Sequence, residues 1–321
     1  MGEFELIRRY FQRPPRRDDV VLGSGDDCAL LAVPAGELLA VSTDTLVSGV
    51  HFFAEVDPRA LGHKALAVNL SDLAAMGATA RWASLALTLP VVDEAWVAAF
   101  AEGFLALADE HQVELIGGDM TRGPLSITVT IQGTVPQEGA LRRSGASPGD
   151  DLYVSGALGG AALALQHLLG KRSLSAEILA PLRRALEWPQ PRLALGEGLR
   201  GLASAALDLS DGLASDLRHL LAASGVGAEV ALEQIPLPAP LGALPPEEAW
   251  ALALAGGDDY ELCFSAPPQQ AAAIQALAAR LACPVTLIGR ITERAGELRW
   301  QHSGQPVAPH WQGWDHFKEA P

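Results

Sequence analysis

Hydrophobic and polar positions alternate with two different periods along the first half of the chain. Between residues 58 and 76, apolar side chains recur every three or four residues, which predicts a helix that ends at Gly77. Residues 93–111 show the same spacing behind Asp93, which we expect to be the N-cap. Residues 126–135 alternate strictly, which predicts a strand. Shorter apolar runs predict an amphipathic helix at 3–11, a short buried strand at 38–41, and strands at 84–89 and 113–116.

The pattern in the second half of the chain predicts another unit of mixed helices and strands. This unit follows a stretch at 136–150 that is rich in Gly, Pro and Ser. Strands are predicted at 151–155, 205–209 and 260–265, with two more near 285–301. Helices are predicted at 159–169, 176–187, 192–203, 211–224, 247–255 and 268–282. We therefore predict a mixed α/β protein with mixed sheets and two domains, at 1–137 and 151–321, joined by a connector at 138–150.

Charge and cysteine content narrow the classes of function. The 321 residues include 38 acidic and 23 basic side chains, so the formal net charge is −15. Such a protein repels phosphates, and we expect no general binding to nucleic acid or to anionic membranes. Residues 1–17 are charged throughout, unlike a secretory signal, and no apolar run reaches the ~18 residues of a membrane helix. Cys28, Cys263 and Cys283 fit neither a disulfide framework nor a zinc site, so we expect reduced core thiols in a cytoplasmic protein.

The common nucleotide-binding loops do not occur in the sequence. Lys171 is followed by Arg172, where a Walker A loop requires Ser or Thr. Gly156, Gly159 and Gly160 follow a predicted strand and precede a predicted helix, but their spacing differs from the dinucleotide fingerprint. This glycine turn either presents backbone amides to an anion or is an ordinary turn.

Aspartates follow small residues at the ends of several apolar runs. Such segments lie at 23–27, 42–44, 116–119, 208–212 and 256–259, and Asp72 adds a carboxylate on a predicted helix. Mg²⁺ takes oxygen ligands, often one or two carboxylates plus substrate phosphates, and glycines let the backbone approach a phosphate. One such segment is more typical of a turn. The whole set leaves a polyphosphate–Mg²⁺ site and plain turn chemistry as open alternatives.

Three other features allow either a ligand-binding or a structural role. The pair Arg142-Arg143 is suited to clamp a phosphate or to belong to a solvated linker. His51 either lines a site or is a core histidine, and the sequence favours the core. Trp311 and Trp314 either stack on a flat ligand ring or cap a core, and the core interpretation is again favoured.

The chain resembles the thiamine-monophosphate kinase family, within the superfamily of aminoimidazole ribonucleotide synthetase. The resemblance lies in strings that occur in the family's order: GSGDDCALL, STDTLVSGVHF, KALAVNLSDLAAMGA, IGGDMTRGPLSITV, RRSGASPGD, LDLSDGL, GGDDYELCF and WQGWDHF. It implies an N-terminal domain that binds ATP and Mg²⁺ and forms a homodimer, and a C-terminal α/β domain. It also implies ATP-dependent phosphorylation of thiamine monophosphate to thiamine diphosphate with several Mg²⁺ ions, and a monovalent cation is a further candidate.

The same resemblance implies roles for individual residues. Metal ligands fall on Asp27, Ser42, Thr43, Asp44, Asp72, Asp119, Asp208 and Asp211. ATP contacts fall on Gly118, Asp119, Arg143 and Ser210, and substrate contacts on His51, Asp258 and Trp314. Asp258 stands where relatives carry Glu, which shortens the reach of the carboxylate. Trp314 stands where some relatives carry Tyr, which removes a phenol hydrogen bond.

A mechanism follows from the charge of the expected substrate. A phosphomonoester has a second pKa near ~6, so it is largely dianionic at neutral pH and needs no general base. We expect direct in-line transfer, with charge neutralised by Arg143 and the metal ligands and without a phospho-enzyme. The alternatives are another ATP-dependent enzyme of the superfamily and a non-catalytic protein that binds nucleotide or thiamine phosphate. Selenophosphate synthetase is disfavoured, because residues 1–22 contain neither Cys nor Lys.

Overall fold

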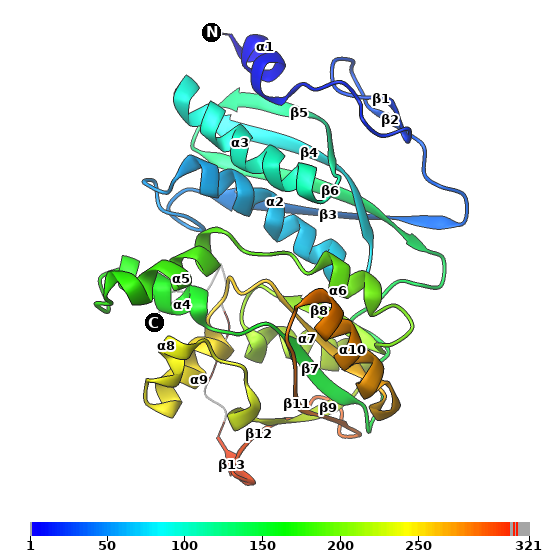
Figure 1. Cartoon of the computed structure of the whole chain (residues 1–321), viewed down its shortest axis with the longest axis vertical. Helices are drawn as coiled ribbons and strands as arrows, with labels where there is room; N and C mark the ends of the chain where they lie inside the picture. The colour runs from blue at the N-terminus through cyan, green and yellow to red at the C-terminus, as the bar shows by residue number, and fades with distance from the viewer. Residues whose placement is uncertain (1, 309–310, 312, 314–321) are drawn as a thin grey trace. The chain divides into compact units, whose positions relative to one another are not determined.

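The structure is a computed structural model that describes residues 2–308, 311 and 313. Its internal contacts divide the chain into two compact units, each built around its own sheet (Figure 1). Unit 1 comprises Met1–Leu73 and Ala78–Gly139, and unit 2 comprises Ala74–Gly77 and Ala140–Pro321. The mixed α/β class with mixed sheets is confirmed. The domain limits drawn from the sequence, and the roles attached to them, stay predictions.

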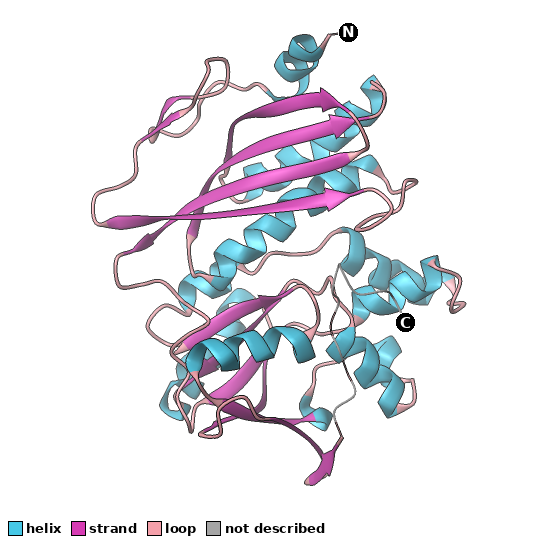
Figure 2. Cartoon of the chain, turned by 180° about the vertical axis from the view of Figure 1, so that it is seen from behind, coloured by secondary structure: helices cyan, strands magenta, loops and turns pink. Residues whose placement is uncertain are grey.

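Unit 1 holds a four-stranded sheet in the order β3-β6-β4-β5. Its strands are β3 (Glu37–Val47), β4 (Thr79–Leu89), β5 (Glu114–Arg122) and β6 (Ser126–Pro136), of which only β4 and β5 pair in parallel. Two helices, α2 (Pro58–Ala75) and α3 (Glu94–Glu110), lie on one face of this sheet, and Figure 2 shows the other face free of helices in the described part of unit 1. The predicted cap of α3 is confirmed, since the Asp93 side chain accepts the N–H groups of Ala95 and Trp96.

The strand predicted as short and buried at 38–41 requires a correction. β3 has eleven residues, and Leu38, Leu39 and Val41 are 43%, 49% and 56% exposed. β3 is an edge strand that pairs with β6 alone among the described strands. The apolar run therefore predicted a strand correctly, but its burial depends on neighbours that the local sequence does not specify.

The N-terminal segment adds small elements that the sequence pattern shows only in part. The predicted helix at 3–11 is present as α1 (Glu3–Leu6), continued by a π-helical turn η1 (Ile7–Phe11). A two-stranded ribbon, β1 (Val20–Leu22) with β2 (Leu30–Leu31), follows it and was not predicted. Val20 of this ribbon packs with Trp82 and Ile116 in a small apolar cluster.

Only two of the three cysteines are core thiols. All three are free, and Cys263 and Cys283 are buried as predicted. Cys28 is exposed, which corrects the prediction for that residue. It lies in the loop between β1 and β2.

Unit 2 holds a seven-stranded sheet in the order β13-β12-β9-β11-β7-β10-β8. Its strands are β7 (Asp151–Ser155), β8 (Ala205–Leu209), β9 (Gly227–Ala231), β10 (Glu261–Ala266), β11 (Val285–Thr292), β12 (Leu298–His302) and β13 (Gln305–Val307). Only β12 and β9 pair in parallel. β7, β8 and β10 are buried along their whole length, because α7 (Leu213–Ser224) and α10 (Ala271–Leu281) lie on opposite faces (Figures 1 and 2).

The remaining helices of unit 2 are short and lie beside this core. They are α4 (Gly160–Leu168), α5 (Ala176–Glu187), α6 (Leu193–Gly198), α8 (Ala239–Gly242) and α9 (Pro246–Ala255), with 3₁₀ turns η2 (Leu232–Gln234) and η3 (Pro268–Gln270). The helix predicted at 192–203 is shortened to α6. Trp311 is buried and packs edge-on against Trp300 with ring centroids 5.5 Å apart, which confirms the core interpretation for Trp311. In the part of the chain that is described, no helix has the length and apolar character needed to span a membrane.

Candidate active site

β3 and α2 bring three candidate metal ligands to the helix-covered face of the unit 1 sheet. The Ser42 hydroxyl donates to Asp72 Oδ2 at 2.6 Å. The backbone N–H of Asp44 donates to Oδ1 of Asn69 at 3.1 Å, and the buried Asn69 amide donates to the Ala65 carbonyl at 2.9 Å. Ser42 and Asp44 are two apart on the strand, so their side chains point to the same face. The donor set here consists of hydroxyl and carboxylate oxygens, the ligand type that Mg²⁺ prefers.

Asp119 and Thr43 lie on the opposite, helix-free face of this sheet. Residues directly opposite one another in a sheet point to the same side. One such row crosses all four strands and consists of Thr45, Thr128, Ala86 and Asp119. The hydroxyls of Thr45 and Thr128 lie 2.8 Å apart, and Thr43 shares the face of Thr45. The candidate ligands of unit 1 are thus divided between the two faces of the sheet.

Gly118 owes its identity to the packing of β5 on β4. The segment 116–119, for which the sequence left turn chemistry as one alternative, lies inside β5. Gly118 has a φ of +150°, and a Cβ at this position would lie 1.8 Å from the carbonyl oxygen of Leu85. A side chain is therefore excluded by the neighbouring strand, whatever else the residue contacts.

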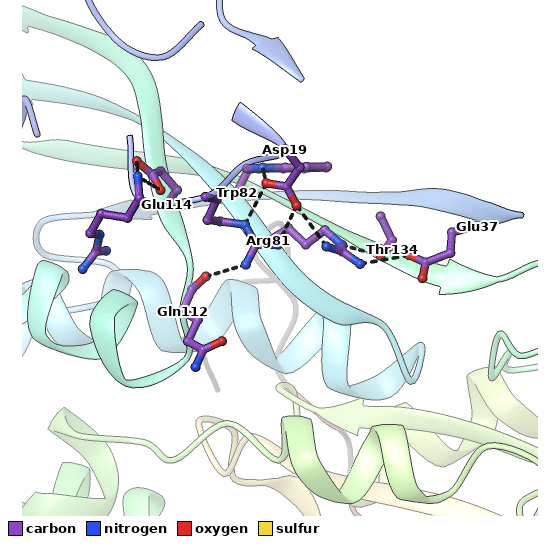
Figure 3. Close-up of polar contacts among 9 residues, drawn as sticks. Asp19, Glu37, Arg81, Trp82, Gln112, Glu114 and Thr134 are labelled. Atoms are coloured by element: carbon purple, nitrogen blue, oxygen red, sulfur yellow. Dashed lines mark hydrogen bonds and ion pairs between the residues drawn. The ribbon is translucent and has the colours of Figure 1, made fainter. Parts of the chain in front are cut away.

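Asp27 lies in the exposed loop between β1 and β2, and the base of that loop is fixed by Asp19 (Figure 3). The Asp19 carboxylate accepts hydrogen bonds from Arg17 at 2.9 and 2.6 Å, from Arg81 at 3.0 Å and from the Trp82 indole at 3.0 Å. The hydrogen bonds from Arg17, then those from Trp82 and Arg81, outweigh partial burial and hold the pKa of Asp19 below its ordinary value.

Arg81 also connects this N-terminal segment to the sheet. Besides Asp19, its guanidinium donates to Thr134 of β6 at 2.6 Å and to Glu37 of β3 at 3.1 Å (Figure 3). The backbone N–H of Arg16 donates to both carboxylate oxygens of Glu114 at 3.1 Å. We call residues 12–31 the N-terminal strap. Together with the pairing of β1 and β2, these contacts hold the base of the loop that carries Asp27.

His51 is not a core histidine, which corrects the structural interpretation favoured by the sequence. It is only partly buried and lies in the turn after β3. Its Nδ1 accepts the backbone N–H of Val47 at 3.0 Å, so the other side of the ring is oriented by this turn.

In unit 2, candidate residues cluster where β8 leads into α7. Asp208 is buried on β8, and Ser210 and Asp211 follow directly. The backbone N–H of Asp211 donates to Oδ2 of Asp216 on α7 at 3.0 Å. Burial raises the pKa of Asp216 to about 7, and the Asp211 charge adds to the rise, whereas backbone hydrogen bonds from Asp211 and Ser210 and the charge of Arg143 oppose it. Sequence reasoning missed Asp216, although a carboxylate among apolar neighbours on a helix was a signal for it.

Asp258 is tied to the same region. Its backbone N–H donates to the Ser210 carbonyl at 2.9 Å, and its Oδ1 accepts the Tyr260 hydroxyl at 3.0 Å. Arg143 is exposed, and its backbone carbonyl accepts the Ser224 hydroxyl at 2.9 Å. Trp314 lies outside the described residues.

The described residues contain no group of three or more His, Cys, Asp or Glu side chains arranged to hold a metal ion. The side chains of Ser42 and Asp72 meet in unit 1, whereas Asp211 contacts Asp216 in unit 2 through its backbone N–H. The side-chain oxygens of these residues suit Mg²⁺ by type.

Comparison with known proteins identifies the family of the chain. The model of the AIR synthase related protein N-terminal domain matches residues 25–135, and that of the C-terminal domain matches residues 147–301. The thiamine-monophosphate kinase of Salmonella typhimurium is 49% identical over 320 residues, which cover 98% of each chain. The chain belongs to the thiamine-monophosphate kinase family. The family resemblance seen in the sequence is therefore confirmed.

Solved structures of this family share the fold. The crystal structure of thiamine-monophosphate kinase from Stenotrophomonas maltophilia superposes with a TM-score of 0.85 at 48% identity, covering 91% of this chain and 93% of that one. AaThiL complexed with AMPPCP and TMP superposes with a TM-score of 0.77 at 31% identity, covering 89% of each chain.

Proposed function

We propose that this protein transfers the γ-phosphate of ATP to thiamine monophosphate and releases thiamine diphosphate and ADP. The observation that carries the proposal is the 49% identity to the Salmonella typhimurium thiamine-monophosphate kinase along 98% of both chains. The complex of AaThiL with AMPPCP, an analogue of ATP, and TMP supports it, since that protein has the same fold.

The proposal assigns the binding roles that the family resemblance implies. ATP is contacted by Gly118, Asp119, Arg143 and Ser210, and thiamine monophosphate by His51, Asp258 and Trp314. The hydrogen bond between the Asp258 N–H and the Ser210 carbonyl supports this assignment within unit 2, because it joins a substrate contact to an ATP contact.

Mg²⁺ ions belong to the proposal as well. The residues that would hold them are Asp27, Ser42, Thr43, Asp44, Asp72, Asp119, Asp208 and Asp211. Bound Mg²⁺ supplies positive charge that offsets the repulsion between the two phosphate groups. The hydroxyl and carboxylate oxygens gathered by β3 and α2 support this assignment. A monovalent cation stays a prediction.

The chain itself has to bind, orient and stabilise charge. A phosphate oxygen of thiamine monophosphate forms a bond to the γ-phosphorus of ATP as the bond from that phosphorus to ADP breaks. The nucleophile is already a dianion at neutral pH, so no side chain is required to remove a proton. The proposal gives Arg143 the role of stabilising negative charge on the transferring group, and alignment of the two substrates supplies the rest of the rate acceleration.

We further propose a homodimer formed by unit 1. Leu39 and Val41 are both about half-exposed and lie on the same helix-free face of β3 as Thr43. A second copy of the chain is the partner that the family resemblance implies for this face. Analytical ultracentrifugation should give twice the chain mass, and Val41→Glu should shift the protein to monomer. A cytoplasmic location stays a prediction.

Two variants and a labelling experiment test the proposal. Asp44→Asn and Asp119→Asn should each lower the turnover of thiamine monophosphate by about 100-fold or more, with unchanged circular dichroism. Near-normal turnover in both variants would contradict the metal assignment. Radioactive γ-phosphate should pass to thiamine diphosphate without labelling the protein. A covalently labelled, kinetically competent enzyme would contradict direct transfer.

A further inference from the structure

The turn at 256–260, which carries Asp258, has an unusual backbone. Asp258 and Tyr260 have φ values of +68° and +50°, the left-handed region that side chains other than glycine rarely adopt. Such conformations persist when surrounding contacts enforce them, and they concentrate at functional sites. The contacts that enforce this turn therefore determine how Asp258 is presented.

One set of contacts ties the turn to the end of β8. The Asp258 N–H donates to the Ser210 carbonyl at 2.9 Å, and the Tyr260 N–H donates to the Leu209 carbonyl at 2.8 Å. These bonds fix the turn from one side only, because both acceptors belong to the same strand end. They leave the residue between the two strained positions, Asp259, to be held by other contacts.

Asp259 holds the turn from the other side. Its two carboxylate oxygens lie 2.9 and 3.1 Å from the backbone nitrogen of Gly159, which donates to them. Gly159 directly precedes α4 and is closely packed. It has a φ of +85° and no room for a Cβ, which would lie 2.7 Å from Leu241 and 2.9 Å from the backbone of Ala253. The glycine turn noted in the sequence does present a backbone amide, and the acceptor of that amide is the side-chain carboxyl group of Asp259.

The position of this carboxylate is electrostatically unfavourable. Burial raises the pKa of Asp259 well above its ordinary value, and the backbone hydrogen bond from Gly159 opposes the rise, whereas Glu261, Asp258 and Asp216 add to it. A carboxyl group buried among acidic neighbours costs folding free energy, and groups kept at such a cost cluster at functional sites.

We propose that Asp259 is a positioning residue, whose hydrogen bond to the Gly159 amide holds the strained turn in which Asp258 meets thiamine monophosphate. This inference rests on the proposed function, which makes Asp258 a substrate contact. Asp259 itself touches neither substrate nor ATP. Loss of the Asp259 side chain should therefore weaken the binding of thiamine monophosphate more than the binding of ATP.

The experiment compares Asp259→Ala, Asp259→Asn and a control, Asp93→Ala. Asp93 also binds backbone N–H groups at the start of a helix, but it belongs to unit 1 and to no proposed binding role. The readouts are KM for each substrate, kcat, the melting temperature, and hydrogen exchange at residues 256–262 measured by mass spectrometry.

Asp259→Ala should raise KM for thiamine monophosphate by about tenfold, the size expected when a hydrogen bond is lost, and KM for ATP by no more than about twofold. Exchange at 256–262 should accelerate. Asp259→Asn keeps one acceptor oxygen. It should therefore return both the KM for thiamine monophosphate and the exchange rate at 256–262 most of the way to the wild-type values. Asp93→Ala should lower the melting temperature and leave both KM values within about twofold of the wild type.

Three results would overturn the inference. They are unchanged exchange at 256–262 in Asp259→Ala, equal increases in the two KM values, and an Asp259→Asn variant as impaired as Asp259→Ala. If Asp259→Ala does not fold, Asp259→Asn must show the same split between the two KM values in milder form. If the wild-type chain makes no thiamine diphosphate, the proposed function fails, and hydrogen exchange still decides whether Asp259 holds the turn.

Discussion

Replacing Asp19 by Ala should loosen the N-terminal strap and, with it, the loop that carries Asp27. The side chains of Asp19 and Arg81 are each 16% exposed, and the ring of Trp82 is fully buried. The substitution leaves the Trp82 indole N–H buried without this acceptor, which costs about 1–3 kcal/mol. It also removes the bonds from Arg17 and Arg81, although Arg81 keeps Glu37 and Thr134. A net loss of about 3 kcal/mol is the expected sum.

Hydrogen exchange of the strap measures this loss more directly than global unfolding, because a chain with two units need not unfold in one step. A local loss of about 3 kcal/mol corresponds to a rise of roughly 100-fold in the exchange rate of amides in residues 20–32. Arg59→Gln, which removes an exposed ion pair to Glu102, is the control and should leave these rates unchanged. An increase of less than about threefold in Asp19→Ala would refute the reasoning.

The same carboxylate predicts a pH dependence. The pKa of Asp19 is lower in the folded chain than its ordinary value of 3.8, so its stabilisation is complete well above pH 3.8 and is lost as the pH falls through the folded-state pKa. The difference in strap stability between the wild type and Asp19→Asn should therefore be constant from pH 6 to 8 and shrink below about pH 4. A difference that grows on acidification would contradict the assignment.

The remaining predictions concern packing and metal. Gly118→Ala should destabilise unit 1 by about 3 kcal/mol or more, because the added Cβ collides with the β4 backbone. Gly117→Ala is the control: nothing lies within 4 Å of its added Cβ, and it should fold normally by circular dichroism. Arg192 binds the buried Glu261 at 2.7 and 2.5 Å, so Arg192→Met should lower the unfolding free energy by about 3–5 kcal/mol. The double variant with Glu261→Gln should recover part of that loss, as measured by urea denaturation. EDTA should abolish turnover, and Mg²⁺ should restore it; full activity in EDTA would exclude the metal.

The sequence predicted those parts of the fold that follow from local pattern. The strict alternation in 126–135 and the helical spacing in 93–111 correspond to β6 and α3. β1 and β2 have three and two residues, too few for any periodicity to appear. The burial of β3 could not be predicted, since it depends on the neighbours of an edge strand rather than on its own residues.

The candidate site shows a similar limit. Motif spacing located Asp44, Asp119 and Asp211, because each follows a recognisable apolar run. It missed Asp259 and Asp19 as structural ties, since their partners lie far along the chain. Gly159 is 100 residues from Asp259, and Trp82 is 63 residues from Asp19. No local pattern distinguishes a carboxylate that will hold a turn from one that will contact a ligand.

Phosphorus NMR of the purified wild-type chain with ATP, Mg²⁺ and thiamine monophosphate tests the central claim most directly. The account predicts that the thiamine monophosphate signal disappears while thiamine diphosphate and ADP accumulate at equal rates, and that omission of thiamine monophosphate stops ADP formation. Folded protein that hydrolyses ATP without forming thiamine diphosphate, or that binds both ligands without any turnover, would contradict it.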